Sequence, residues 1–234
     1  VFPPPSAATA GFRAWHISSL DEYRRQHRAS VENPEQFWDT EAKRLAWFHP
    51  WDSVLQWRAP DARWFDGGKI NACYNCVDRH VQAGFGEQTA IVWEGEPVMP
   101  ASFTRERSGP FEVRRVSYRQ LLVETSKVAN ALKSLGVKRG DVVTIYMPMV
   151  PELAIAMLAC ARIGAVHSVI FGGFAPTAIS ERAQDAKSRV IVTADGGFRR
   201  GDVVALLKNV EEAVSSLANH GHIVNHVLVL ERTG

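Results

Sequence analysis

The chain has 234 residues, 46% of them hydrophobic and 22% charged, which is typical of an ordinary globular protein and excludes a disordered or fibrous one. Lys and Arg number 27 against 25 Asp and Glu, so the net charge of +2 offers no general attraction to nucleic acid or an anionic membrane. No apolar run approaches the roughly 20 residues that cross a bilayer, and three cysteines are too few for a disulfide framework. We therefore expect a cytosolic protein without nucleic-acid or membrane partners.

The first part of the chain, up to about Gly86, is predicted to be an aromatic-rich extension, irregular and helical in pieces. The run Ser19–Glu22 predicts a capping box at the start of a helix that extends to about Arg28. Asn33 and Pro34 predict the start of a second helix, because Asn caps a first turn and Pro at the first helical position loses no hydrogen bond. The tryptophans of this part indicate either a local aromatic core or packing across a larger body.

Strands and helices alternate from about Thr89 onward. The expected strands are 89–94, 114–117, 141–147, 165–171, 189–193 and 226–230, and the expected helices are 118–135, 151–163, 176–187 and 202–217. A segment bearing Pro, Gly and Ser from 95 to 110 is predicted to be an exposed loop.

This alternation predicts the fold class. Strand–helix–strand units of this length need right-handed crossovers, which produce a parallel sheet covered by helices on both faces. We expect an α/β fold with a doubly wound, mainly parallel sheet and a helical, aromatic-rich N-terminal extension. The extension would comprise residues 1–86, and residues 87–234 would form the first part of the α/β domain.

Two loops that follow expected strands carry the candidate site, because ligands of parallel sheets bind outside the carboxyl ends of the strands. Gly172 and Gly173 follow one strand, where absent side chains let backbone amides approach a ligand; Phe171 lies beside them. Arg199 and Arg200 follow the next strand and supply planar charged groups suited to phosphate. Since consecutive strands often lie side by side, the two loops are expected to meet at one edge and bind a phosphorylated, aromatic-containing ligand.

Simpler interpretations of the same residues remain open. Paired glycines are also typical of a tight connection, and loop arginines are often only solvated. Neither G-x-G-x-x-G after a strand nor G-x-x-x-x-G-K-[ST] occurs, so no triphosphate cradle is expected within this sequence.

A metal site is not expected. Cys73 and Cys76 have the spacing of a zinc or redox pair, but no second pair accompanies them, which favours two buried thiols. His220, His222 and His226 extend across a glycine-bearing loop, an arrangement that does not favour metal binding. We find no catalytic constellation in the chain.

Four specific strings are spread along the sequence: Trp64–His80, Ile91–Pro97, Ile145–Leu153 and Ala156–Phe174. Together they resemble the N-terminal part of the acetyl-CoA synthetases, the AMP-forming acetate:CoA ligases of the adenylate-forming superfamily. The chain begins with Val1 and ends just after an expected strand, which also indicates a longer polypeptide. The resemblance implies the partial large domain of the adenylate-forming fold.

The resemblance also implies an activity with ATP, Mg²⁺ and CoA. Acetate and Mg-ATP would form acetyl-adenylate and pyrophosphate, and CoA would then attack to give acetyl-CoA and AMP. The ATP loop, the acetate pocket and the catalytic lysine are expected in a missing C-terminal part of the polypeptide. Residues 1–234 alone are therefore expected to be inactive.

By this resemblance, one end of CoA binds to this chain. The positions of Phe171, Gly172, Gly173 and Arg199 contact the adenine and 3′-phosphate end of CoA in the family. Asp202 stands where the family often has a second basic residue, a role expected here of Arg200.

Two other functions stay open, a non-catalytic CoA- or nucleotide-binding module and a propionate:CoA ligase. The forms Tyr74–Cys76 and Trp93–Glu96 favour acetate.

Overall fold

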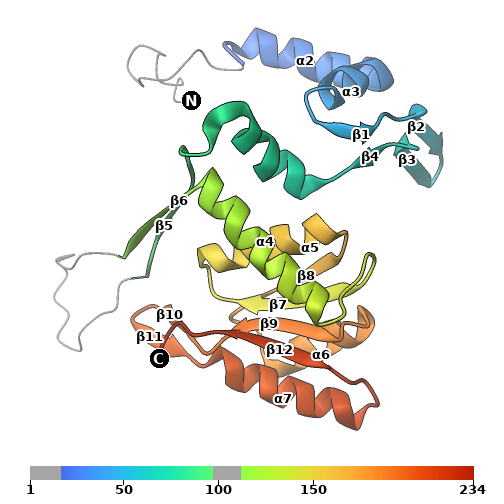
Figure 1. Cartoon of the computed structure of the whole chain (residues 1–234). Coiled ribbons are helices and arrows are strands. Elements are labelled where there is room, and N and C mark those ends of the chain that lie inside the picture. Colours follow the sequence, from blue (N-terminus) through green and yellow to red (C-terminus); the bar gives the residue numbers. More distant parts are fainter. Residues whose placement is uncertain (1–16, 97–111) are drawn as a thin grey trace. The chain divides into compact units, whose positions relative to one another are not determined.

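A computed structural model describes residues 17–96 and 112–234 (Figure 1). The contacts divide the chain into two compact units, Val1–Ile70 and Asn71–Gly234. The expected boundary of the family domain after residue 86 stays a prediction. The loop expected at 95–110 lies, beyond Glu96, outside the described residues. None of the helices within them combines the length and the apolar character that crossing a membrane requires.

The first unit combines helices with short antiparallel strand pairs. Its described elements are, in chain order, α2 (Leu20–Glu32), α3 (Pro34–Ala42), β1 (Trp47–His49), β2 (Ser53–Arg58), β3 (Asp61–Asp66) and β4 (Lys69–Ile70). Both predicted helices are confirmed, and the Ser19 hydroxyl accepts a hydrogen bond from the Glu22 amide at 3.1 Å. The Glu22 carboxylate, however, accepts from Ser18 rather than from Ser19.

The strands of this unit correct the prediction of an irregular and helical segment. β1 pairs with β4, and β2 pairs with β3. These strands are short and mostly exposed, so they show no alternation of apolar and polar residues. The signal that distinguishes a strand in a sequence is therefore missing here.

Aromatic side chains pack together inside the first unit. Trp47, Trp51 and Phe65 have ring centroids 4.9 to 5.4 Å apart. The Trp47 indole donates to the carbonyl of Ala42 at 2.9 Å, and the Trp51 indole donates to Asp39 Oδ1 at 3.2 Å. These tryptophans thus form a local core, which is one of the two roles expected for them.

The second unit is built around a parallel sheet. Its elements are, in chain order, the π-helical segments η1 (Tyr74–Asp78) and η2 (Val81–Phe85), β5 (Thr89–Glu94), β6 (Val113–Ser117), α4 (Tyr118–Ser134), β7 (Val142–Met147), α5 (Pro151–Ile163), β8 (Val166–Phe171), α6 (Pro176–Asp185), β9 (Val190–Ala194), β10 (Gly197–Arg199), β11 (Asp202–Val204), α7 (Leu206–Asn219) and β12 (His226–Leu230). Four parallel strands pair in the order β12-β9-β7-β8, while β5 with β6 and β10 with β11 form separate antiparallel pairs. The expected α/β class is confirmed.

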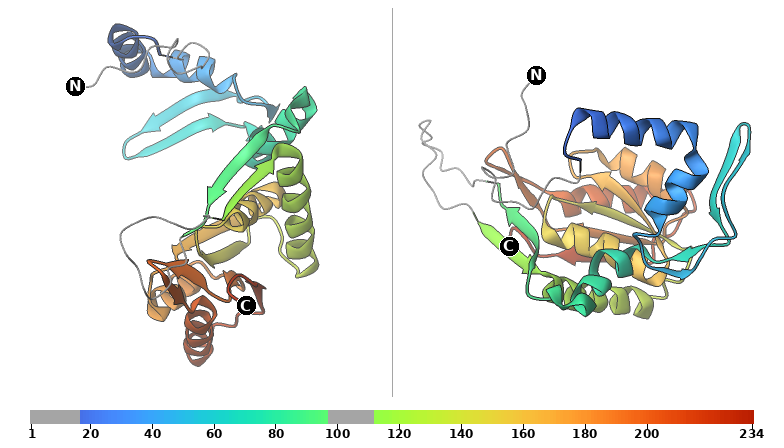
Figure 2. Two further views of the ribbon diagram at one scale, coloured as in Figure 1. Left: turned by 90° about the vertical axis from the view of Figure 1, so that its left-hand side faces the viewer. Right: turned by 90° about the horizontal axis from the view of Figure 1, so that it is seen from above.

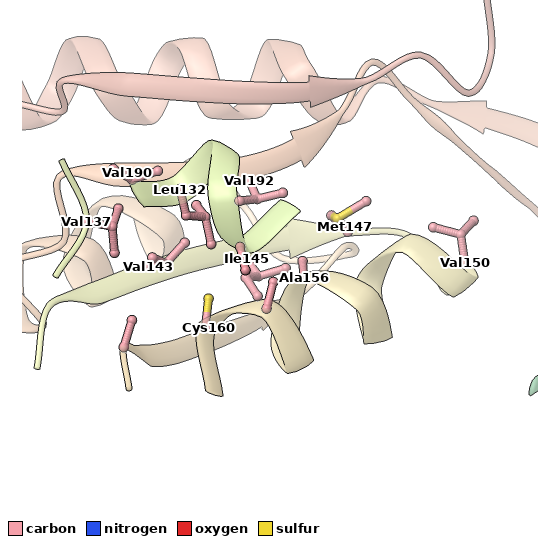
Figure 3. Packing of buried hydrophobic residues seen from close by; sticks show 13 residues of the cluster. Leu132, Val137, Val143, Ile145, Met147, Val150, Ala156, Cys160, Val190 and Val192 are labelled. Atoms are coloured by element: carbon pink, nitrogen blue, oxygen red, sulfur yellow. The ribbon is translucent and has the colours of Figure 1, made fainter. Parts of the chain in front are cut away.

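Strand β7 contributes to a core on each face of the sheet. Val143, Ile145 and Met147 pack with buried residues of α4 and α5, as Figure 3 shows for α5 residues such as Cys160. Tyr146 points to the other face and packs with residues of α6 and α7. Figures 1 and 2 show α4 and α5 on one side of the sheet and α6 and α7 on the other. Every residue of β9 is likewise buried.

Two side chains before β5 attach their segment to the end of α5. The Asn71 amide donates to the carbonyls of Ala161 and Arg162, in the last turn of the helix, at 3.0 and 3.2 Å. Both Asp78 carboxylate oxygens accept from the Arg162 guanidinium, at 3.1 and 2.7 Å. These residues of the family-like string Trp64–His80 therefore have a structural role.

The helix predicted at 202–217 was wrong at its start. Residues 197–204 form the β10–β11 hairpin, and α7 begins at Leu206. Arg200 and Gly201 take φ of 55° and 90°, which is the geometry of a two-residue hairpin turn, and Gly adopts it without strain. Val203, expected on the inner face of a helix, is 59% exposed. Asp202 therefore pairs across a hairpin and caps no helix.

The packing of β7 generates a stability prediction. Ile145 is fully buried, so Ile145→Ala should lower the free energy of unfolding by about 2–5 kcal/mol through lost contacts and a cavity. Val123→Ala, at a 45% exposed position of α4, should change it by less than about 0.5 kcal/mol. Urea denaturation followed by circular dichroism measures both, and equal small effects would contradict the assigned core.

Candidate functional site

A pocket of about 170 Å³ lies at the carboxyl ends of the parallel strands of the second unit. Segments that follow all four strands line it. The lining residues are Trp93, Glu96, Met147, Pro148, Met149, Val150, Phe171, Gly172, Gly173, Gly197, Phe198, Arg199, Val204, Leu206 and Arg232. This is the end of a parallel sheet where ligands bind.

The strand order explains why the candidate loops meet. The prediction that the strands before them lie side by side was wrong, because β7 lies between β8 and β9. The chain leaves β7 for β8 on one side and then crosses to β9 on the other. The two loops therefore flank the end of β7, where the reversal of strand order leaves a crevice.

The glycine loop after β8 is held from inside the protein. The buried Tyr146 hydroxyl lies 2.9 Å from the Phe174 carbonyl and 3.2 Å from the Gly172 carbonyl, and it accepts from Asn209 Nδ2 at 3.0 Å. The rings of Phe171 and Phe174 pack edge to face, with centroids 6.0 Å apart. The loop is thus a fixed structure with an exposed aromatic side chain at each end.

Arg199 lies against this glycine loop. Its guanidinium carbon is 5.1 Å from the centroid of the Phe171 ring. A Cβ added to Gly173 would lie 2.5 Å from Arg199 Nη1, so only glycine leaves room for the guanidinium. Within residues 17–96 and 112–234, no carboxylate forms an ion pair with Arg199. Its charge therefore remains available to an anion.

Arg200 and Asp202, the charged residues next to Arg199, do not line the pocket. Arg200 occupies the hairpin turn, is exposed and is absent from the pocket lining. Asp202 is the register partner of Arg199 in the hairpin, so the two side chains project from directly opposite positions. The structure brings Phe171, Gly172, Gly173 and Arg199 together and leaves Arg200 at the edge of the site.

Asp195, the first residue after β9, binds the end of the chain. Its carboxylate accepts from the amides of Arg232, Thr233 and Gly234 at 2.8 to 3.1 Å, and from the Gly196 amide at 2.7 Å. Partial burial raises the pKa of Asp195, but these hydrogen bonds lower it more, from 3.8 to about 2. The segment after β12 is thus attached to the segment after β9.

Sequence reasoning missed Trp93 and Arg232, which also line the pocket. The guanidinium carbon of Arg232 lies 5.3 Å from the Trp93 ring centroid. The rule that residues after each parallel strand matter would have identified Arg232, since it follows β12. No comparable signal marks Trp93, because it comes from a strand outside the parallel sheet.

The cysteines differ in burial. Cys73 is buried and Cys76 is exposed, so the prediction of two buried thiols was wrong for Cys76. Burial raises the pKa of the Cys160 thiol from 9.0 to about 11. Among the residues that the structure describes, no three His, Cys, Asp or Glu side chains are placed to hold a metal ion.

The glycine loop and Arg199, which has no carboxylate partner among the described residues, thus lie at the carboxyl ends of an α/β sheet, where the ligands of this class of domain bind. Sequence comparison gives its family: the model described as AMP-binding enzyme matches residues 79–233, so the chain belongs to the AMP-binding enzymes. A second model, described as the acetyl-coenzyme A synthetase N-terminus, matches residues 23–76.

Curated relatives are named for one enzyme. The chain is 49% identical over 219 residues to an acetyl-coenzyme A synthetase of Rhodopirellula baltica, covering 93% of this chain and 31% of the relative. It is 47% identical over 226 residues to one of Deinococcus radiodurans, covering 97% and 32%. The chain thus spans about a third of the length of the relatives that it matches.

The hydrogen bonds to the Asp195 carboxylate predict that the free energy of unfolding depends on pH. Because folding lowers its pKa, the carboxylate stabilises the native state above about pH 4, and this contribution is lost as pH falls toward about 2. We expect Asp195→Asn to lower the free energy of unfolding at about pH 6, and this difference from the parent to shrink between about pH 4 and pH 2. Denaturant titrations across this range measure it, and a pH-independent difference would contradict the assignment.

Proposed function

We propose that this chain is the N-terminal part of an AMP-forming acetate:CoA ligase and contributes part of its CoA site. Family membership and the names of the relatives support the reaction class. The observation that carries the site is the Arg199 guanidinium, which no carboxylate of residues 17–96 and 112–234 pairs with, beside Gly173 and Phe171 in a pocket at the carboxyl ends of the sheet.

The proposed reaction has two steps. A carboxylate oxygen of acetate attacks the α-phosphorus of ATP, pyrophosphate leaves, and a mixed anhydride results. The sulfur of CoA then attacks the acyl carbon, AMP leaves, and the thiol proton is released. Among the described residues no three His, Cys, Asp or Glu side chains are placed to hold a metal ion, and we propose that ATP, Mg²⁺ and acetate bind in the remaining two thirds of such an enzyme.

The role of this chain in that reaction is binding. Phe171 is 51% exposed and offers a face on which the adenine ring of CoA can stack. Gly172 lets the loop pack on the Met147 carbonyl, and Gly173 leaves room for the Arg199 guanidinium beside the Phe171 ring. Arg199 binds the 3′-phosphate through charge-assisted hydrogen bonds, and Arg200, at the turn, adds positive potential from a greater distance.

The proposal also covers the rest of the fold, the cellular location and the acyl substrate. The four parallel strands belong to a larger doubly wound sheet, with residues 1–86 as an aromatic-rich extension and 87–234 as the start of the adenylate-forming domain. All three cysteines are free, which is consistent with a cytosolic location. The names of the relatives favour acetate over propionate.

Substitution of the two arginines tests the proposal. Arg199→Ala should weaken CoA binding to residues 1–234 by about 10- to 100-fold, because a charge-assisted hydrogen bond contributes roughly 1.5–3 kcal/mol. Arg200→Ala should weaken it by less than about three-fold, since exposed charges beyond the contact are screened. Isothermal titration calorimetry gives the dissociation constants.

Dephospho-CoA is the matched ligand for this experiment, because it lacks only the 3′-phosphate. We expect Arg199→Ala to leave its affinity nearly unchanged. Equal weakening for both ligands would refute the assigned site.

The register of the hairpin generates a separate prediction. Asp202 is the register partner of Arg199 without an ion pair between them, so its negative charge lowers the positive potential that a phosphate meets there. Asp202→Asn should therefore tighten CoA binding about two- to five-fold, with a smaller gain at high salt. Glu211→Gln, the same charge change at an exposed position of α7, is the control and should have no effect. Unchanged affinity in Asp202→Asn would show that Asp202 does not act on the site.

A further inference from the structure

The side chain of Arg232 is enclosed by groups from three separate segments. Its guanidinium carbon lies 5.1 Å from the Phe198 ring centroid and 5.3 Å from that of Trp93. Its Nη2 lies 2.7 Å from Glu112 Oε2, and the side chain is 22% exposed. Arg232 therefore contacts three segments. These are β5, Glu112 just before β6, and the β10–β11 hairpin.

The backbone at Arg232 is fixed independently of its side chain. Asp195 binds the amides of Arg232, Thr233 and Gly234 in succession, and it accepts from the Thr233 hydroxyl at 3.0 Å. Figure 1 shows β10 and β11 beside this end of the chain. Arg232 is thus fixed both at its backbone and at its guanidinium group.

The hairpin that carries Arg199 needs such support. Its two strands have three residues each, and an isolated two-stranded pair is marginally stable in water. At its base, a Cβ added to Gly197 would lie 2.8 Å from Pro148 Cβ, so the hairpin packs closely on the segment after β7. Beyond that base, Phe198 packs on Arg232, and Arg199 is the next residue.

We propose that Arg232 is a positioning residue, which fixes the hairpin through Phe198 and so directs Arg199 into the pocket. This inference rests on the proposed CoA site. The charge of Arg232 is already paired with Glu112, whereas Arg199 has no carboxylate partner among the described residues. Arg232 therefore acts through the hairpin and makes no contact with the phosphate of the ligand.

A double-mutant cycle tests this indirect action. Arg232→Ala should weaken CoA binding to residues 1–234 by about five-fold in the parent background and leave it unchanged in Arg199→Ala, because both remove the same contact. Additive losses would overturn the proposal, since they would mean that Arg232 binds the ligand itself.

The matched control is Arg114→Ala. Arg114 lies 5.8 Å from the same Trp93 ring and forms an ion pair with Glu152 at 2.7 Å, but it does not line the pocket. The Arg114→Ala variant should leave CoA affinity unchanged. A loss of CoA affinity equal to that of Arg232→Ala would overturn a specific role for Arg232.

Hydrogen exchange of the ligand-free chain separates this inference from the proposed function. Arg232→Ala should speed amide exchange across Gly197–Val204 at least ten-fold while exchange in α4 stays at the parent rate. Arg232→Lys keeps a charge for Glu112 but has no planar group to stack, so faster exchange there as well supports stacking as the cause. Unchanged hairpin exchange in Arg232→Ala overturns the inference even if CoA binds, whereas equal CoA affinity of Arg199→Ala and the parent refutes the proposed CoA site and leaves the effect of Arg232 on the hairpin standing.

Discussion

The pairing of β7 with two parallel neighbours is the constraint on which the second unit depends. β8 and β9 are separated in sequence by α6, and each forms its parallel pairing with β7 rather than with the other. Side chains of β7 enter the cores on both faces, so shifting the register by one residue would exchange Ile145 and Tyr146 between them. The same pairing places the two ligand loops on either side of the end of β7.

Buried hydrogen bonds connect the paired strands to the glycine loop of the candidate site. The Thr193 hydroxyl of β9 donates to the Tyr146 carbonyl at 2.8 Å, while the Tyr146 hydroxyl contacts carbonyls of the glycine loop. A tyrosine with an apolar ring in the core and a bonded hydroxyl is stable there, whereas an unpaired hydroxyl would be costly. The glycine loop is therefore shaped from inside the protein before any ligand arrives.

Local signals in the sequence predicted most elements of the second unit, because they depend on residues close together. At the start of α4, the Ser117 hydroxyl accepts from the Gln120 amide at 3.2 Å and Gln120 Oε1 accepts from the Ser117 amide at 2.9 Å, so a capping box forms within four residues. The strand order was not predictable in this way, since no short motif encodes which strands pair. The hairpin turn at Arg200 was missed because Val203 and Leu206 also fit a helical pattern.

The candidate site was predictable where it depended on strand ends and residue chemistry, as for Gly173 and Arg199. The contact of Arg232 with Phe198 required knowledge of the tertiary structure, since these residues belong to separate loops. The first unit was the least predictable, because its strands are too short and exposed to show a period.

The different environments of the three cysteines have a practical consequence. Cys73 and Cys160 are enclosed by the core, whereas the Cys76 sulfhydryl is open to reagents. A maleimide dye or spin label added to the native chain would therefore attach at a single place, without removal of the other thiols. A label at this native cysteine would let fluorescence or electron paramagnetic resonance measurements follow motions of the chain without any substitution.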